Sequence, residues 1–199
     1  ATRTRPTPVT QIIQSLTDIS DRYDVLLCDL WGCVHDGVKV YPEAIPALRA
    51  FRAAGKIVVL LTNSPRDRHA VAEQVARFGL PDDCWDTIAS SGDAARAALF
   101  TGAVGQKVHV MGEQPGDGFF REMEIIDNPV AVERVGIAEA EGLVCLGPDD
   151  PSADPETWRP DLVYAKQKGL KLLCANPDIV VDRGERREWC AGAVAALYT

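Results

Sequence analysis

The sequence predicts an α/β fold with a largely parallel sheet, on two observations. Short apolar runs recur along the 199-residue chain, and one of them, Val25–Asp29, ends in a carboxylate. Such runs are typical of strands that are buried on both faces of a parallel sheet. Segments with helical spacing of their apolar residues lie between the runs, and this alternation of strand and helix is the pattern of α/β proteins.

Composition excludes several other classes of protein. Hydrophobic residues make up 46% of the chain and charged residues 25%, as in an average globular protein, so a disordered or collagen-like chain is excluded. The longest apolar runs, such as Ile57–Leu61, are far shorter than the roughly 18 residues of a membrane-spanning helix. The net charge of -8 argues against general nucleic-acid binding, which requires basic surface. We therefore expect neither a membrane nor a nucleic acid as a partner.

The cysteines and the N-terminus indicate the compartment. None of the six cysteines forms a Cys-x-x-Cys pair, and their irregular spacing fits neither a zinc site nor a disulfide framework. We expect six reduced thiols that act as small hydrophobic side chains. The chain starts without a charged and then apolar leader, although cleavage before Ala1 is left open. These features predict a cytoplasmic protein.

The first hundred residues give a regular succession of strand and helix signals. Gly55 ends one segment with helical periodicity, and Gly79 ends the next. Ser64-Pro65 predicts the start of that second helix, with serine as the N-cap and proline at the first helical position. In order, the predicted elements are a short leading helix around residues 12–16, a strand at 25–29, a helix over 43–54, a strand at 57–61, a helix over 64–78, a weaker strand at 85–88 and a helix over 93–100.

The stretch Gly102–Gly105 predicts a boundary, after which the alternation resumes. Residues 147–151 are rich in turn formers and predict a loop, and Pro155 predicts the start of a helix. In order, the predicted elements are a strand at 107–111, a short helix over 119–123, a strand at 142–146, a helix over 154–168, a strand at 171–174 and a helix over 189–198.

Polar residues end two of the predicted strands, and we expect them to meet. A β-α-β crossover makes the strands that end at Asp29 and Thr62 parallel, so both ends lie at one sheet edge, where open α/β sheets bind ligands. A threonine hydroxyl beside free N–H groups at a helix N-terminus suits a phosphate. An aspartate there suits a nucleophile or a cation ligand. Structural roles remain alternatives, with Asp29 capping its loop and Thr62 to Ser64 capping a helix.

Three segments resemble the motifs of a known superfamily. Asp29–Gly37 (DLWGCVHDG) resembles the first motif of the haloacid dehalogenase superfamily, and Leu60–Arg66 (LLTNSPR) resembles the second. The Thr-Asn form of the second motif, together with Ala175–Asp178 (ANPD), points to subclass IIA. That subclass contains sugar-phosphate, nitrophenyl-phosphate and pyridoxal-phosphate phosphatases. The resemblance covers roughly residues 24–199, with the motifs in the order of the family.

The resemblance implies a reaction and assigns roles. Asp29 would attack phosphorus and form an aspartyl-phosphate, while Thr62 and the backbone amide of Asn63 would hold the phosphate. Mg²⁺ would be bound by Asp29 and by the backbone carbonyl of Trp31. Trp31 stands where the family has a second aspartate, which protonates the leaving oxygen and then activates water. An indole has no usable acid–base chemistry, and general acid–base catalysis is worth about 10²–10⁴-fold in rate.

The resemblance also implies a Rossmann-like, doubly wound parallel-sheet core with an inserted α/β cap domain. We place the N-terminal part of the core at 1–101, the cap at 102–188 and a return to the core at 189–199. The Asn-Pro-Asp turn would lie near the entrance of the active site, so Asn176 and Asp178 are candidate substrate contacts. The third-motif lysine and the fourth-motif acids of the family have no counterpart in the sequence, which predicts a core that is incomplete at the C-terminus.

The leading hypothesis is a Mg²⁺-dependent phosphohydrolase-like enzyme that acts on a small phosphorylated metabolite. Trp31 leaves two alternatives: a catalytically impaired protein that binds a phosphorylated ligand, and a phosphotransferase-type variant whose aspartyl-phosphate is hydrolysed slowly. His35, Arg66 and Arg68 beside the two loops are more typical of solvated side chains than of substrate contacts. The sequence is compatible with a homo-oligomer and does not define the substrate.

Overall fold

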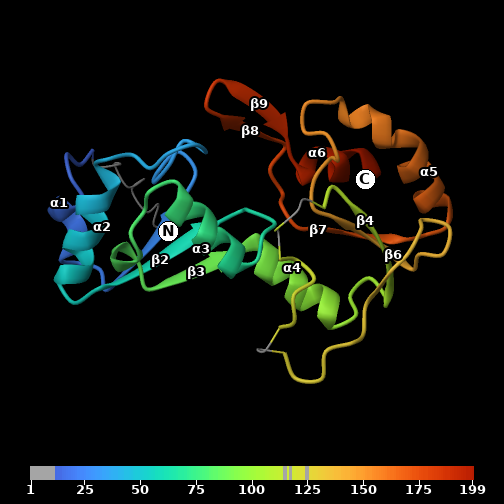
Figure 1. Cartoon of the computed structure of the whole chain (residues 1–199), viewed down its shortest axis with the longest axis horizontal. Helices are drawn as coiled ribbons and strands as arrows, with labels where there is room; N and C mark the ends of the chain where they lie inside the picture. The colour runs from blue at the N-terminus through green and yellow to red at the C-terminus, as the bar shows by residue number, and fades with distance from the viewer. Residues whose placement is uncertain (1–11, 114–115, 117, 124–125) are drawn as a thin grey trace, which may run out of the picture.

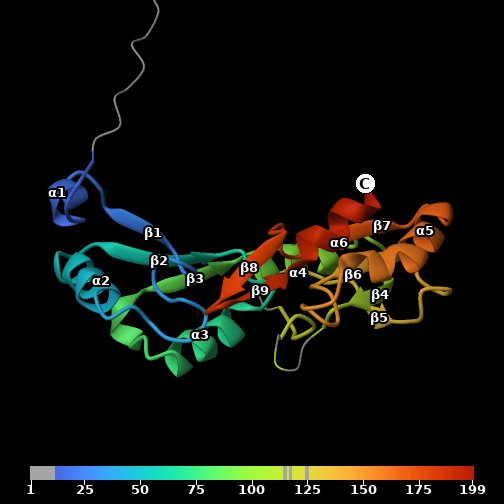
Figure 2. The same cartoon turned by 90° about the horizontal axis from the view of Figure 1, so that it is seen from above.

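The computed structural model of the chain describes residues 12–113, 116, 118–123 and 126–199. It consists of two α/β lobes that lie side by side (Figure 1). The first lobe contains a sheet with the strand order β1-β2-β3, and the second lobe a sheet with the order β5-β4-β6-β7. A two-stranded hairpin, β8–β9, lies between the lobes (Figure 2). The predicted α/β class is therefore confirmed.

The sheet of the first lobe is parallel throughout. Its register pairs Asp29 with Leu61, so Thr62 ends its strand one residue beyond the level of Asp29. The predicted meeting of these two strand ends is thus present in the fold. The elements of this lobe are α1 (Thr17–Ser20), β1 (Val25–Asp29), α2 (Ala44–Ala53), β2 (Ile57–Thr62), α3 (Arg68–Arg77), the 3₁₀ turn η1 (Asp82–Cys84) and β3 (Thr87–Ser90).

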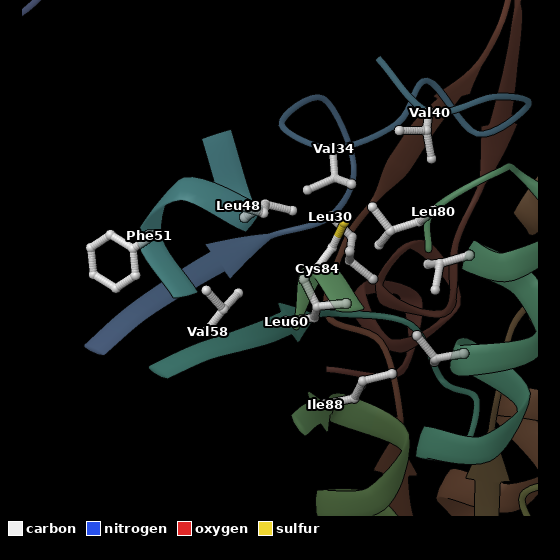
Figure 3. Packing of buried hydrophobic residues seen from close by; sticks show 12 residues of the cluster. Leu30, Val34, Val40, Leu48, Phe51, Val58, Leu60, Leu80, Cys84 and Ile88 are labelled. Atoms are coloured by element: carbon white, nitrogen blue, oxygen red, sulfur yellow. The ribbon is translucent and has the colours of Figure 1, made fainter. Parts of the chain in front are cut away.

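Both helices α2 and α3 cover the same face of the first sheet (Figure 2). Val58 and Leu60 of β2 point into this layer, where α2 contributes Leu48 (Figure 3). The opposite face carries apolar side chains that are exposed, with Leu27 at 63%. The prediction that these strands are buried on both faces is therefore wrong in the first lobe. The other exposed large hydrophobic residues of these strands are Val25, Ile57 and Leu61.

The sheet of the second lobe is covered on both faces. Val144 of β6 packs with α4, whereas its neighbour Leu143 packs with α5 and α6, as the alternation of side chains along a strand requires. The elements are α4 (Ser91–Phe100), β4 (Lys107–Met111), β5 (Glu133–Arg134), β6 (Gly142–Cys145), the 3₁₀ turn η2 (Pro155–Trp158), α5 (Arg159–Gln167), β7 (Lys171–Cys174) and α6 (Ala191–Tyr198).

Helix α4 connects the two lobes (Figure 1). It follows β3 directly, yet Leu99 packs in the same cluster as Val108 and Val144 of the second sheet. The division of the chain into 1–101, 102–188 and 189–199 stays a prediction, and α4 is the element that both lobes share.

The hairpin of β8 (Val180–Arg183) and β9 (Arg186–Trp189) was not predicted. Its strands are antiparallel, and Arg183 pairs with Arg186 across a two-residue turn. Gly184 opens that turn with a φ of 59°, a left-handed value that favours glycine. The hairpin occupies the segment before α6, so the helix predicted over 189–198 starts two residues later than expected.

Three predicted helices differ from the structure. The leading helix is only the turn α1 and lies after residue 16. Helix α3 begins after Asp67, not at Ser64, because the Asp67 carboxylate accepts a hydrogen bond from the Ala70 N–H at 2.7 Å and takes the N-cap role. Residues 119–123 form a turn in which the Phe119 carbonyl accepts a hydrogen bond from Arg96 at 2.8 Å instead of closing a helical turn.

All six cysteines are unpaired, as the sequence predicted. Burial raises the pKa of Cys28 to about 11, so this thiol stays protonated near neutral pH. None of the helices in the described part of the chain is both long and apolar enough to cross a bilayer.

Candidate active site

A cavity of about 630 Å³ lies between the lobes and collects the predicted site residues. The first lobe contributes the ends of β1 and β2 and the loops that follow them, and the second lobe contributes the hairpin and the turn before it. Every predicted site residue lines this cavity: Asp29, Trp31, Thr62, Asn63, Asn176 and Asp178. The fold therefore brings together residues that the sequence separates widely.

Asp29 and Trp31 present oxygen atoms at the end of β1. One carboxylate oxygen of Asp29, Oδ1, accepts a hydrogen bond from the Leu30 N–H at 2.8 Å, and Oδ2 has no partner among the described residues. The backbone carbonyl of Trp31 likewise accepts no hydrogen bond from the described residues. These are hard oxygen donors of the kind that Mg²⁺ prefers. Within the same residues, no group of three or more His, Cys, Asp and Glu side chains forms a separate metal site.

The loop of residues 62–66, here called the phosphate loop, is held against the start of α4. The hydroxyl of Thr62 accepts a hydrogen bond from the Ser64 N–H at 3.2 Å, and the Ser64 carbonyl accepts one from the Gly92 N–H at 2.9 Å. A Cβ atom on Gly92 would lie 2.2 Å from the Arg66 carbonyl oxygen and 2.3 Å from that of Pro65. Only glycine therefore allows this close approach of loop and helix.

The Asn-Pro-Asp turn of the second lobe reaches the phosphate loop. Buried Asn176 shapes the turn, because its side-chain oxygen accepts a hydrogen bond from the Asp178 N–H at 2.9 Å. The Asp178 carboxylate then accepts a hydrogen bond from Asn63 Nδ2 at 3.1 Å. This contact joins residues 115 positions apart in the sequence and connects the two lobes across the cavity.

Trp31 connects the hairpin to the loop after β1, residues 31–40, which we call the flap. The indole Nε1 of Trp31 donates a hydrogen bond to the Asp182 carbonyl at 2.8 Å, and the Arg183 guanidinium lies 5.3 Å from the ring centre. Gly37 also lies close to the indole, since a Cβ there would be 2.5 Å from Trp31 Cζ2. A second bond joins the same segments, from the Gly184 N–H to the Asp36 carbonyl at 3.3 Å.

His35 is buried, and the prediction of a solvated histidine is wrong. It is 2% exposed, and its ring lies 5.4 Å from that of Trp31 and 5.0 Å from that of Phe78, both edge-on. Nδ1 accepts a hydrogen bond from the Gly37 N–H at 3.0 Å, so in the neutral ring the proton resides on Nε2. Burial lowers the pKa of His35 below its usual value, which favours this neutral form.

The carboxylates around the cavity differ in their partners. Backbone N–H groups of Lys39 and Val38 bind the Asp36 carboxylate and lower its pKa. Arg187 binds the Asp182 carboxylate at 2.7 and 3.1 Å and lowers its pKa in turn. Glu188 forms an ion pair with Arg183 at 2.9 Å. The three carboxylates are thus committed to other groups of the protein.

A buried ionic cluster lies behind the phosphate loop. Arg96, 4% exposed, pairs with Asp93 at 2.8 Å, and Asp93 also pairs with Arg68 at 2.6 Å. Asp67 is fully buried and pairs with Arg121 at 3.1 Å. The side chain of Arg68 is 41% exposed, as expected of a solvated arginine, and in addition pairs with Asp93. The cluster joins the start of α3 to Asp93 and Arg96 of α4 and to the segment that follows β4.

The sequence missed the hairpin residues of the cavity, above all Asp182 and Arg183. Their strands are charged and carry no apolar alternation. The pair Gly184-Glu185 is the sequence feature that could have predicted the hairpin, since glycine at the first position of a two-residue turn is typical of a tight hairpin.

These features define the class of protein: an α/β protein with its polar site at the strand ends of one lobe and covered by a second lobe. A family model described as haloacid dehalogenase-like hydrolase matches residues 26–126. The chain therefore belongs to the haloacid dehalogenase-like hydrolases. A search of curated proteins finds no match.

Solved structures agree with this family. A hydrolase of the haloacid dehalogenase-like family from Brucella suis 1330 is 37% identical, with a TM-score of 0.85, over 94% of this chain and 66% of that one. A p-nitrophenyl phosphatase from Archaeoglobus fulgidus is 24% identical, with a TM-score of 0.62, over 88% and 64%. A glycerol phosphate phosphatase from Mycobacterium tuberculosis, in complex with magnesium, is 20% identical, with a TM-score of 0.61, over 90% and 52%. The chain thus spans less than two thirds of the length of each. The two phosphatases, both under 25% identical, share the fold of this chain.

Proposed function

We propose that this chain carries the reacting part of a Mg²⁺-dependent phosphohydrolase, which cleaves a small phosphorylated metabolite through an aspartyl-phosphate on Asp29. The observation that supports this most is the convergence of Asp29, Thr62 and Asn63 on one cavity from adjacent parallel strands. Asp29 Oδ2 attacks phosphorus, the bond from phosphorus to the leaving oxygen breaks, and the phosphoryl group is held by the Thr62 hydroxyl and the amide of Asn63. Water then releases phosphate from Asp29.

Mg²⁺ fits the oxygen atoms at the end of β1. Asp29 and the carbonyl of Trp31 would hold it, with phosphate oxygens and waters completing its coordination. The ion would neutralise charge on the phosphoryl group as the reaction proceeds. Magnesium in the structure of the Mycobacterium phosphatase, which shares this fold, supports the choice of metal.

Trp31 at the place of the acid–base aspartate supports a second candidate function. In it, the protein binds a phosphorylated ligand without hydrolysing it, or holds the aspartyl-phosphate for transfer to another molecule. Its indole is committed to the Asp182 carbonyl and to Arg183, so it contributes to positioning and not to proton transfer. The size of the cavity suits a small metabolite.

The test is a phosphate-release screen on the full-length protein with Mg²⁺, across sugar phosphates, nitrophenyl phosphate and pyridoxal phosphate. We expect turnover that EDTA abolishes and that Asp29→Asn lowers to less than about a tenth, because an amide neither attacks phosphorus nor binds the metal well. An Asp29→Asn variant that retains more turnover than this would show that Asp29 is not the nucleophile. Binding of phosphorylated compounds without release would favour the second function.

A further inference from the structure

We propose that Asp178 performs the proton transfers that Trp31 cannot perform, so that the acid and base of the reaction come from the second lobe. This rests on the function proposed above. The protonated Asp178 carboxyl gives its proton to the leaving oxygen, and the resulting carboxylate later accepts a proton from the water that attacks the aspartyl-phosphate.

The other carboxylates of the cavity apart from Asp29, and His35, are unsuited to this task. Asp36 is bound by two backbone N–H groups, Asp182 by Arg187 and Glu188 by Arg183. The contacts of Asp36 and Asp182 stabilise the ionised carboxylate and lower its pKa, which opposes uptake of a proton, and the Glu188 carboxylate is engaged by Arg183. His35 has its Nδ1 lone pair engaged by the Gly37 N–H, and burial disfavours its charged form. The His35 ring therefore has no free lone pair with which to accept a proton, and burial disfavours the charged ring that would donate one.

Asp178 differs from them in its partners. Its Oδ1 accepts a hydrogen bond from the neutral amide of Asn63, and no cation of the described residues pairs with it. Its second oxygen, Oδ2, has no partner among the same residues. A carboxyl group that one neutral contact orients and that no cation of the described residues holds has the geometry that general acid–base catalysis needs.

The position of Asp178 also suits the direction of the reaction. Asp29 attacks from the first lobe, and in an in-line displacement the leaving oxygen departs on the side opposite to the attack. Asp178 belongs to the second lobe, and its contact with Asn63 holds the carboxyl beside the loop that would bind the phosphoryl group.

Protons and bonds balance over the two steps. In the first, the bond between Asp29 and phosphorus forms, the bond from phosphorus to the leaving oxygen breaks, and the proton of Asp178 moves to that oxygen. In the second, water attacks the phosphorus of the aspartyl-phosphate, its proton moves to Asp178, and Asp29 leaves as a carboxylate. The protein is then restored and phosphate is released.

The test measures the rate at which the full-length protein with Mg²⁺ forms its phosphoenzyme, by rapid quench, with two substrates. p-Nitrophenolate leaves readily without a proton, whereas an alkoxide such as that from glycerol phosphate needs one. In Asp178→Asn we expect phosphoenzyme formation from glycerol phosphate to slow by about 10²–10⁴-fold and that from nitrophenyl phosphate by far less. The phosphoenzyme should also persist, because the base for its hydrolysis is lost. Asp178→Glu should restore part of both steps.

Asp182→Asn is the matched control, since it removes a cavity carboxylate that Arg187 already binds, and it should leave the ratio of the two substrate rates unchanged. Equal slowing of both substrates by Asp178→Asn, or no slowing, would overturn the proposal and leave Asp178 as a residue that only positions Asn63. If Asp178→Asn fails to fold, Asp178→Glu takes its place. In that variant, slower overall turnover with an unchanged ratio of the two substrate rates and a normal phosphoenzyme lifetime would likewise overturn the proposal. Absence of any Asp29-dependent turnover in the unmodified protein would instead refute the proposed function itself.

Discussion

Replacing Trp31 by phenylalanine should loosen the hairpin without removing the aromatic ring from the flap. The change deletes the 2.8 Å hydrogen bond from the indole to the Asp182 carbonyl and keeps a ring that can face His35. A hydrogen bond of this kind contributes about 0.5–1.5 kcal/mol. Because the bond joins the flap to the hairpin, its loss should raise the open fraction of the hairpin by about 2- to 12-fold.

The assay is amide hydrogen exchange of the hairpin, residues 180–189, measured by mass spectrometry. We expect exchange in this segment to accelerate by about the same 2- to 12-fold in Trp31→Phe, while α5 and β6 stay as they were. Trp85→Phe is the matched control, because the buried Nε1 of Trp85 has no hydrogen-bond partner among the described residues. Unchanged hairpin exchange in Trp31→Phe, or an equal change in the control, would refute the idea that the indole holds the hairpin over the cavity.

Three further predictions follow from the same structure. Trp31→Asp should increase phosphate release from glycerol phosphate by far less than the roughly 10²–10⁴-fold of a well-placed acid and base, because Asp178 already supplies this chemistry and the flap is packed around an indole; a gain of that full size would show that the unmodified protein lacks an acid. Arg96→Met should lower the free energy of unfolding by about 3–5 kcal/mol in urea titrations, because it breaks the buried ion pair with Asp93 and leaves the Phe119 carbonyl without its donor, and a loss below about 1 kcal/mol would contradict this account of the cluster. The double change Leu27→Lys and Leu61→Lys should reduce self-association of the 199-residue chain, measured by light scattering, because both residues lie on the exposed apolar face of the first sheet. Self-association that persists in this variant would show that another surface causes it.

Strand positions were predictable where burial alone decides them. The apolar runs located β1 and β4 to the residue, because each run is bounded by polar or glycine residues that end the strand. Whether the second face of a sheet is buried was not predictable from an apolar run. Leu27 and Leu143 both lie in such runs, yet Leu27 is exposed and Leu143 is buried, because helices cover the face on which Leu143 lies and not the one on which Leu27 lies. The start of α3 was misplaced because Ser64 and Asp67 both suit an N-cap, and the buried cluster around Asp67 decides between them.

The site was predictable only in the part that one β-α-β unit builds. Parallel strands place the residues after β1 and β2 at one edge whatever the rest of the fold does, so Asp29 and Thr62 could be paired from the sequence. The contact between Asn63 and Asp178 depends on how two lobes lie against each other, and no local pattern encodes that. The burial of His35 was missed for the same reason, because its neighbour Phe78 comes from another segment. The catalytic and binding roles of these residues stay predictions until the variants are measured.

Gly92 limits how the cavity can be redesigned. A methyl group at this position would already overlap the carbonyls of the phosphate loop, so a library that varies residue 92 would mainly yield displaced loops. The hairpin offers the opposite situation, because Arg183 and Glu188 line the cavity from a two-stranded ribbon whose side chains meet mostly one another. Selection for new substrates should therefore randomise the hairpin and keep the glycine. The cavity has one wall that must be preserved and one that can be varied.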